Sequence, residues 1–235
     1  MRRYLLKLDG VSKKFGYKTI LKNISFEVAP GEFVLLLGKN GVGKSTLLKI
    51  ICSLMLPSQG TLWLHGQPYK NCLQTLLREI GYISHESRLY GDLTAQENLQ
   101  LFGTLYHVEA LDQKIEQTLA QVELDSVRLA VVRNFSSGML KRLAIARFLL
   151  YQPELLILDE PYTGLDQVFV AKFQQYLADY QRSGKTVIMV THQFDYGQEL
   201  ATRCLVLHHK HILHDVSAKE LTFDRYQKWI EDPCN

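Results

Sequence analysis

The 235-residue sequence has no long hydrophobic run, few cysteines and little net charge. No stretch approaches the ~20 apolar residues that a membrane-spanning helix needs, so we predict no transmembrane segment. The first residues, MRRYLLKLDG, hold only a short apolar run broken by charges, which is typical of a first strand rather than a signal peptide. The four cysteines are scattered, without the paired spacing of metal or redox motifs, so we expect reduced thiols in a cytosolic protein.

Charge and composition are those of an ordinary globular protein. The net charge of +3 does not decide for or against nucleic acid, because non-specific binding needs a dense basic patch. The sequence has no internal repeat and no low-complexity tract. With 46% hydrophobic and 22% charged residues, it is typical of a soluble chain. Its length fits one large domain, or one domain with a subdomain.

Short apolar runs alternate with helical patterns along the chain. We expect strands over residues 4–8, 24–28, 33–37, 61–64, 80–84, 155–158 and 187–190, and a hairpin over 206–213. We expect helices over 94–124, 139–150, 167–182 and 218–230, and one after a glycine loop at residue 38. This alternation predicts a mainly parallel α/β sheet covered on both faces. We predict a single domain over residues 1–235, in which an αβ core of 1–91 and 135–235 carries an inserted helical subdomain over 92–134.

A glycine-rich stretch, Gly38-Lys-Asn-Gly-Val-Gly-Lys-Ser-Thr46, follows a buried strand and precedes a helix. It contains G-x-x-x-x-G-K-S in the context that a phosphate-binding loop requires. Glycines let backbone N–H groups point at a phosphate, and the helix N-terminus adds partial positive charge. We predict that Lys44 reaches the β- and γ-phosphates and that Ser45 ligates Mg²⁺. The nucleotide contacts predicted here are Gly38, Asn40, Gly41, Gly43, Lys44, Ser45 and Thr46.

A second chemical signal is Leu155-Leu-Ile-Leu-Asp-Glu160, in which an apolar run ends in two carboxylates. A strand buried on both faces delivers Asp159 and Glu160 at its C-terminal edge, where α/β sheets bind ligands. We predict that Asp159 holds Mg²⁺ and that Glu160 orients or deprotonates the attacking water. The alternative is an ordinary strand end capped by acids, and the phosphate loop upstream argues against it.

These motifs, in this order, resemble those of the ATP-binding subunits of ABC transporters, and the resemblance covers nearly the whole chain. It implies a P-loop NTPase fold of the ABC type, with a mainly parallel sheet, an antiparallel β portion and an inserted helical subdomain. It also implies an ATPase that uses ATP and Mg²⁺.

The stretch Phe135-Ser-Ser-Gly-Met139 looks like the family's signature segment, with Ser136 and Gly138 at its serine and second glycine. Ser137 and Met139 depart from the family pattern, at the first glycine and at the glutamine. The segment precedes a helix, so its N–H groups can face a phosphate on the partner subunit. A serine at the first-glycine position is still small, and we expect binding to survive.

The resemblance assigns roles to further residues. Asp166 ends Thr163-Gly-Leu-Asp166, which resembles the D-loop that crosses the dimer interface. His192 follows a buried strand and resembles the switch histidine that contacts the γ-phosphate. Phe15 lies where the family stacks an aromatic ring on adenine, and Tyr17 is the second candidate.

His85 leaves a strand where most members of the family have a glutamine that touches Mg²⁺ or the water. A neutral imidazole can also accept from water or ligate a metal, so we predict a catalytic and metal-binding role for His85. This histidine and Thr191-His-Gln193 resemble the haem-exporter ATP-binding subunits of cytochrome c maturation. Ser-Gly-Met in the signature segment is shared with many other exporters, so a generic drug, polysaccharide or lipid exporter is the alternative.

The resemblance also implies partners. Two ATPase subunits, identical or different, would enclose two ATP molecules, and separate integral membrane subunits would move the cargo. We therefore expect a peripheral protein on the cytoplasmic side of the cell membrane, with no nucleic acid partner. A nucleic-acid-linked ABC ATPase is the alternative class, but the long coiled coils, zinc modules or second ATPase unit of such proteins do not appear here. The histidines of 207–214 fit a polar hairpin turn better than a metal or haem site.

Overall fold

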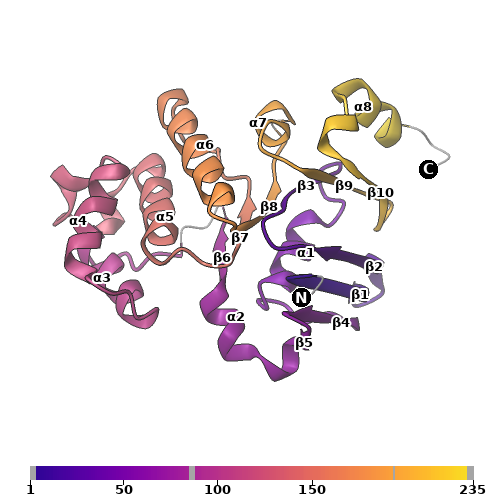
Figure 1. Ribbon diagram of the computed structural model, residues 1–235, viewed down its shortest axis with the longest axis horizontal. Coiled ribbons are helices and arrows are strands. Elements are labelled where there is room, and N and C mark those ends of the chain that lie inside the picture. The colour runs from indigo at the N-terminus through magenta and orange to yellow at the C-terminus, as the bar shows by residue number, and fades with distance from the viewer. Residues whose placement is uncertain (1–3, 85–87, 193, 232–235) are drawn as a thin grey trace. The chain divides into compact units, whose positions relative to one another are not determined.

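The structure, a computed structural model, describes residues 4–84, 88–192 and 194–231 (Figure 1). The prediction for His85 therefore falls outside the described residues. The chain forms two compact units. The first contains Met1–Tyr82, Glu154–Pro161 and Gln174–Asn235, and the second contains Ile83–Pro153 and Tyr162–Phe173. The second unit includes the segment 92–134, for which a helical subdomain is predicted.

Figure 1 labels the helices and strands in chain order. The strands are β1 (Leu6–Phe15), β2 (Lys18–Val28), β3 (Phe33–Leu37), β4 (Gln59–Leu64), β5 (Gln67–Pro68), β6 (Ile80–Ile83), β7 (Leu155–Asp159), β8 (Thr186–Val190), β9 (Arg203–His208) and β10 (His211–Ser217). The helices are α1 (Lys44–Ile51), α2 (Leu73–Glu79), α3 (Ala95–Leu105), α4 (Leu111–Gln121), α5 (Ser137–Tyr151), α6 (Gln167–Arg182), α7 (Phe194–Gln198) and α8 (Phe223–Glu231). No helix among the described residues has the length and apolar character of a membrane span.

The first unit is built around a six-stranded sheet with the strand order β10-β9-β3-β8-β7-β6. The strands β3, β7, β8 and β9 are parallel, and β10 pairs antiparallel with β9. Every residue of β3, β7 and β8 is buried, and a strand covered on both faces needs an almost continuous apolar run. Parallel strands end at one edge of a sheet, so the segments that follow β3, β7 and β8 are brought together.

The other sheet of the first unit has four antiparallel strands in the order β2-β1-β4-β5. Leu6 of β1 pairs with Val28 of β2 on one side and with Leu64 of β4 on the other. One hydrophobic core joins this sheet to α1 and to the six-stranded sheet, and Leu6, Leu47 and Ile157 are fully buried in it. This shared core fixes α1, and with it the glycine loop that precedes the helix.

The second unit is mainly helical, and α3, α4 and α5 contact one another. α3 begins with a capping box: Thr94 Oγ accepts from the N–H of Glu97, whose carboxylate accepts from the N–H of Thr94. The sequence predicts this start, because Thr followed three residues later by Glu satisfies two unpaired N–H groups of a helix N-terminus.

The prediction of one continuous helix over 94–124 is wrong, because the chain forms two helices there, α3 and α4. Between them, His107 and Ala110 adopt positive φ angles of 54° and 51°, which interrupt an α-helix. The final helix begins at Phe223, later than predicted, since residues 218–220 form a 3₁₀ turn. The short helices α2 and α7 are not predicted, because seven and five residues are too few for an apolar helical period to repeat.

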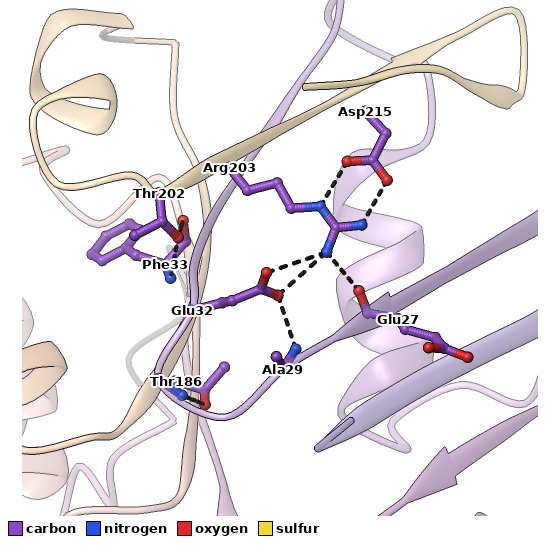
Figure 2. A network of polar contacts seen from close by, with 9 residues as sticks. Glu27, Ala29, Glu32, Phe33, Thr186, Thr202, Arg203 and Asp215 are labelled. Carbon is purple, nitrogen blue, oxygen red and sulfur yellow. Dashed lines mark hydrogen bonds and ion pairs between the residues drawn. The ribbon is translucent and has the colours of Figure 1, made fainter. Parts of the chain in front are cut away.

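Arg203, at the start of β9, joins the two sheets of the first unit (Figure 2). Its guanidinium donates two hydrogen bonds of 2.6 Å to the Asp215 carboxylate and one of 2.8 Å to the backbone oxygen of Glu27 in β2. Its Nη1 also lies 3.3 Å from a carboxylate oxygen of Glu32, which accepts from the N–H of Ala29. The hydrogen bond to Asp215 is the main cause of a raised pKa of Arg203, so the guanidinium stays charged.

We predict that Arg203→Met lowers the free energy of unfolding by roughly 1–3 kcal/mol, because the partly buried Glu32 and the more exposed Asp215 lose their counterion. Arg182→Met is the matched control: the Arg182–Asp179 pair is exposed, so its removal should change the free energy by less than about 0.5 kcal/mol. Urea denaturation followed by circular dichroism measures both variants. Equal effects would contradict the role assigned to Arg203.

Candidate active site

The segment of residues 38–46 runs from the end of β3 into the first turn of α1. At two of its positions, the backbone conformation or the space available suits only glycine. Gly38 has a φ of 151°, and a Cβ there would lie 2.3 Å from the backbone oxygen of Leu207. Gly43 caps α1 with a φ of 116°, and a Cβ there would lie 3.0 Å from Leu21 and 3.1 Å from Ile20. The glycine pattern therefore follows from steric limits, and this backbone can turn its N–H groups toward a phosphate.

Lys44 is the first residue of α1, and its side chain folds back over the loop. Its Nζ donates to the backbone oxygen of Gly38 at 2.6 Å and to that of Lys39 at 3.0 Å. Burial lowers the pKa of Lys44, while the negative charges of Glu160 and Asp159 act in the opposite direction. Phosphate oxygens are stronger acceptors than these carbonyls because they are charged, so the ammonium can exchange the carbonyls for a nucleotide.

Asp159 ends β7 and accepts two side-chain hydrogen bonds. The Ser45 hydroxyl donates to its Oδ1 at 3.2 Å, and the Tyr82 phenol donates to its Oδ2 at 3.2 Å. The residue is only 4% exposed. A hydroxyl beside a carboxylate is the hard oxygen donor set that Mg²⁺ prefers, so these side chains fit the predicted metal. Tyr82 is not found from the sequence, because a tyrosine in an apolar strand gives no signal beyond core packing.

Glu160 and His192 form a side-chain pair beyond the ends of β7 and β8. His192 Nδ1 lies 2.8 Å from Glu160 Oε2, and the N–H of His192 donates to the same oxygen at 3.2 Å. Glu160 has a φ of 51°, which is uncommon for a residue other than glycine, and its own N–H donates to the backbone oxygen of Val190. Strained residues of this kind cluster at functional sites, which favours a chemical role over a passive strand end.

A pocket of about 580 Å³ lies beside the phosphate loop in the first unit. Its walls come from the start of β2, the loop, the β9–β10 turn and the end of α8, and they include Asn40 and Gly41. Lys18 also lines this pocket. Its strand partner at the tip of the β1–β2 hairpin is Phe15, whose side chain is 49% exposed. An exposed ring at this tip is available for stacking. Thr46 lies in the first turn of α1.

The signature-like and D-loop-like segments contact each other in the second unit. Ser136 caps α5, and its Oγ accepts from the N–H of Met139 at 3.3 Å. A Cβ at Gly138 would lie 3.1 Å from the backbone oxygen of Gly164, so a glycine allows the two segments to approach. Ser136 and Gly138 both lie at the N-terminus of α5, where the N–H groups and the helix dipole favour an anion.

Asp166 is fixed by two hydrogen bonds. Its Oδ1 accepts from the N–H of Phe169 at 2.9 Å, and its Oδ2 lies 2.5 Å from Arg142 Nη2. These two hydrogen bonds, the one from Phe169 first, lower the pKa of Asp166. Arg142 also pairs with Glu123, which binds Lys172. The sequence does not reveal this cluster, because charges within helical patterns are usually solvated.

The predicted residues that the structure describes thus fall into two groups. The first unit contains Phe15, Gly38, Asn40, Gly41, Gly43, Lys44, Ser45, Thr46, Asp159, Glu160 and His192. The second unit contains Ser136, Gly138 and Asp166.

The sequence matches a family model, described as ABC transporter, over residues 21–163. The chain belongs to the ABC transporter family. The matched region includes the phosphate loop, the signature segment and the acidic end of β7. The fold class and the family predicted from the sequence are therefore confirmed.

Relatives of this ABC protein include ATP-binding subunits of several systems. The bacitracin transport ATP-binding protein BcrA of Enterococcus faecalis is 32% identical, over 97% of this chain and 74% of its own. The cytochrome c biogenesis ATP-binding export protein CcmA of Nitrosococcus oceani is 36% identical, over 80% of this chain and 85% of its own. The Nod factor export ATP-binding protein I of Paraburkholderia xenovorans is 34% identical, over 86% of this chain and 67% of its own.

Solved structures agree with this assignment. The ATP-binding subunit of an ABC transporter superposes with a TM-score of 0.89 at 25% identity, over 97% of this chain and 100% of that chain. A dimeric ATP-binding cassette, bound to ADP and Pi in a post-hydrolysis state, superposes with a TM-score of 0.83 at 28% identity, over 92% of this chain and 100% of that chain. The protein is an ATP-binding subunit of an ABC transporter, and it is an ATPase.

We predict that Lys44→Ala raises the dissociation constant for ATP by at least about 10-fold, because charge-assisted hydrogen bonds to phosphate contribute roughly 1.5–3 kcal/mol. Calorimetric titration of the purified chain with ATP measures the change. Lys49→Ala removes the same charge from the last turn of the same helix and should leave ATP binding unchanged. Tight ATP binding by the Lys44 variant would contradict the role of this lysine.

Proposed function

We propose that the chain is a motor subunit that couples ATP hydrolysis to transport by separate integral membrane subunits, from the cytoplasmic side of the cell membrane. The observation that carries this proposal is the edge of the six-stranded sheet, where Lys44 follows the buried strand β3 and where Asp159 and Glu160 stand at the end of the buried strand β7. Membership of the ABC family supports the transport role, and the site geometry supports the assignment of individual residues.

The phosphate end of ATP is held by the loop and by Lys44. Backbone N–H groups of residues 38–46 and the α1 dipole attract the phosphates, and the Lys44 ammonium neutralises charge on the β- and γ-phosphates. Ser45 and Asp159 would hold Mg²⁺, and His85 remains a proposed further contact. Once bound, the metal neutralises the charge that develops on the transferred phosphoryl group.

Glu160 is the proposed base for the attacking water. Glu160 follows Asp159, the proposed metal ligand, directly in the chain. Its carboxylate lies at the edge of the sheet where the γ-phosphate of ATP would lie. His192 contacts Glu160 through both its ring and its backbone N–H, so it fixes the direction of the carboxylate. We infer that Glu160 accepts the proton of the water while His192 orients Glu160 and contacts the γ-phosphate.

Assembly into a dimer completes the proposed site. Ser136, the N-cap of α5, and Gly138, in its first turn, can bind the γ-phosphate of ATP on a second subunit, identical or different. Asp166, held by Arg142, fixes the loop beside that cap. Adenine would stack on Phe15. A solved relative is dimeric with ADP and Pi bound, which supports this arrangement.

The cargo that we propose first is haem, which would be exported for cytochrome c biogenesis. The relative CcmA, 36% identical, is named for cytochrome c biogenesis, and His85 with Thr191-His192 favours the same group. Relatives named for bacitracin transport and Nod factor export favour a generic exporter as the alternative. Affinity purification from the native membrane distinguishes the two. If the cargo is haem, a haem-handling membrane protein should co-purify with the chain. Co-purification of a membrane subunit of a drug or polysaccharide exporter would instead exclude haem as the cargo.

We predict that Glu160→Gln lowers ATP turnover by at least about 100-fold, because general-base catalysis contributes roughly 10²–10⁴-fold. ATP should still bind, and a dimer should accumulate with ATP. Steady-state ATPase assays and size-exclusion chromatography measure the two effects. Glu154→Gln is the matched control: Glu154 pairs with Lys185 before the start of β7, and its loss should leave turnover within about 2-fold. Unchanged ATPase activity of the Glu160 variant would exclude this base.

A further inference from the structure

A charged cluster in the second unit joins three helices through one carboxylate, that of Glu123. Glu123 follows the end of α4, Arg142 lies in α5, and Lys172 lies in α6. Arg142 Nη1 donates to Glu123 Oε2 at 2.5 Å, and Lys172 donates to the other oxygen of the same carboxylate. The proposed function uses Asp166 and the N-terminus of α5, but it assigns no role to Glu123.

The Arg142 guanidinium is held at two nitrogens and on one face. While Nη1 donates to Glu123, Nη2 donates to Asp166 at 2.5 Å. The ring of Phe169 lies against the guanidinium, with its centroid 4.3 Å from Cζ, and the N–H of Phe169 donates to Asp166 as well. The Arg142 side chain is only 17% exposed. Because a guanidinium is a rigid planar fork, the contact of Nη1 with Glu123 determines where Nη2 is offered to Asp166.

The backbone at Glu123 is one that glycine would adopt more easily. Its φ is 61°, and the two hydrogen bonds that close α4 run from the N–H of Glu123 to Ala120 and from the N–H of Leu124 to Leu119. This is the Schellman motif, in which the residue at the position of Glu123 is usually glycine. A side chain in a strained conformation indicates a functional constraint, so the contacts of this carboxylate outweigh the strain.

The charges of the cluster favour a fixed orientation more than they favour stability. Hydrogen bonds from Lys172 first and then from Arg142 lower the pKa of Glu123, so the carboxylate stays charged at neutral pH. Half-exposed ion pairs contribute little to the free energy of unfolding unless they form a network. The effect of this network should therefore be seen in the position of Asp166 rather than in the stability of the fold.

We propose that Glu123 is a positioning residue for the dimer face of the second unit, because it orients Arg142 and thereby fixes Asp166 beside the N-terminus of α5. The inference rests on the proposed dimer, in which Ser136, Gly138 and Asp166 face a second subunit. Glu123 acts through Arg142 and needs no contact with ATP.

Glu123→Gln tests the proposal, because it removes the charge and keeps the length of the side chain. The variant is made in the Glu160→Gln chain, where a dimer should accumulate with ATP, and the dimer is measured by sedimentation equilibrium. We expect the dissociation constant of the dimer to rise about 3- to 10-fold, the range of a charged hydrogen bond that is partly exposed. An unchanged constant would overturn the proposal, whereas a Glu160→Gln chain that forms no dimer with ATP would overturn the proposed dimer itself.

Glu116→Gln is the matched control in the same helix, α4. Glu116 pairs with Arg128 at 3.5 Å and its side chain is 70% exposed, so its loss should leave the dimer constant within about 2-fold. An equal rise for the two variants would mean a general effect of charge on α4 and would overturn the role of Glu123.

Glu123→Gly separates positioning from stability. Glycine relieves the strained backbone while it removes the carboxylate, so thermal unfolding should occur at a temperature no lower than for Glu123→Gln. The dimer should nevertheless be weakened as much as in Glu123→Gln. A glycine variant that dimerises like its parent would show that the carboxylate is not needed and would overturn the proposal.

A double variant tests the route through Asp166. If Glu123 acts by fixing Asp166, adding Glu123→Gln to Asp166→Asn should weaken the dimer no further than Asp166→Asn does alone. Fold-changes that multiply would instead show that the two residues act independently, and would overturn this route.

Discussion

The active site depends on the parallel register of three buried strands. Asp159 of β7 pairs with Val190 of β8, and Met189 of β8 pairs with Leu35 of β3. This register ends the strands at one edge, so the loop after β3, the carboxylates at the end of β7 and the histidine after β8 meet there. A slip of one residue would reverse the side chains of a strand. The hydrogen bond from Ser45 to Asp159 would then be lost.

The sequence was sufficient where a pattern has one physical explanation. The apolar runs of β3, β7 and β8 have no polar face, which predicts strands buried on both sides. Two glycines of the phosphate loop, Gly38 and Gly43, mark positions where a Cβ would be obstructed. The family and the fold follow from these features. The roles of single residues, such as Phe15 and Asp166, remain predictions supported by their positions.

Contacts between segments that lie far apart in the chain could not be predicted from the sequence. Tyr82 donates to Asp159, and Arg142 binds Asp166, but neither residue stands in a pattern that distinguishes it from packing or a solvated surface. The break between α3 and α4 was missed because it depends on two residues with positive φ that are not glycine, His107 and Ala110. Backbone strain of this kind leaves no mark in hydrophobic periodicity.

The Arg203 cluster has a consequence for how the first unit unfolds. A guanidinium in β9 of one sheet holds a carbonyl of β2 in the other, beside a hydrophobic core that both sheets share with α1. Neither sheet can separate without breaking a charged hydrogen bond and exposing that core. The two sheets should therefore act as one cooperative unit, so that the phosphate loop, anchored between them through α1, is lost only when the whole unit unfolds.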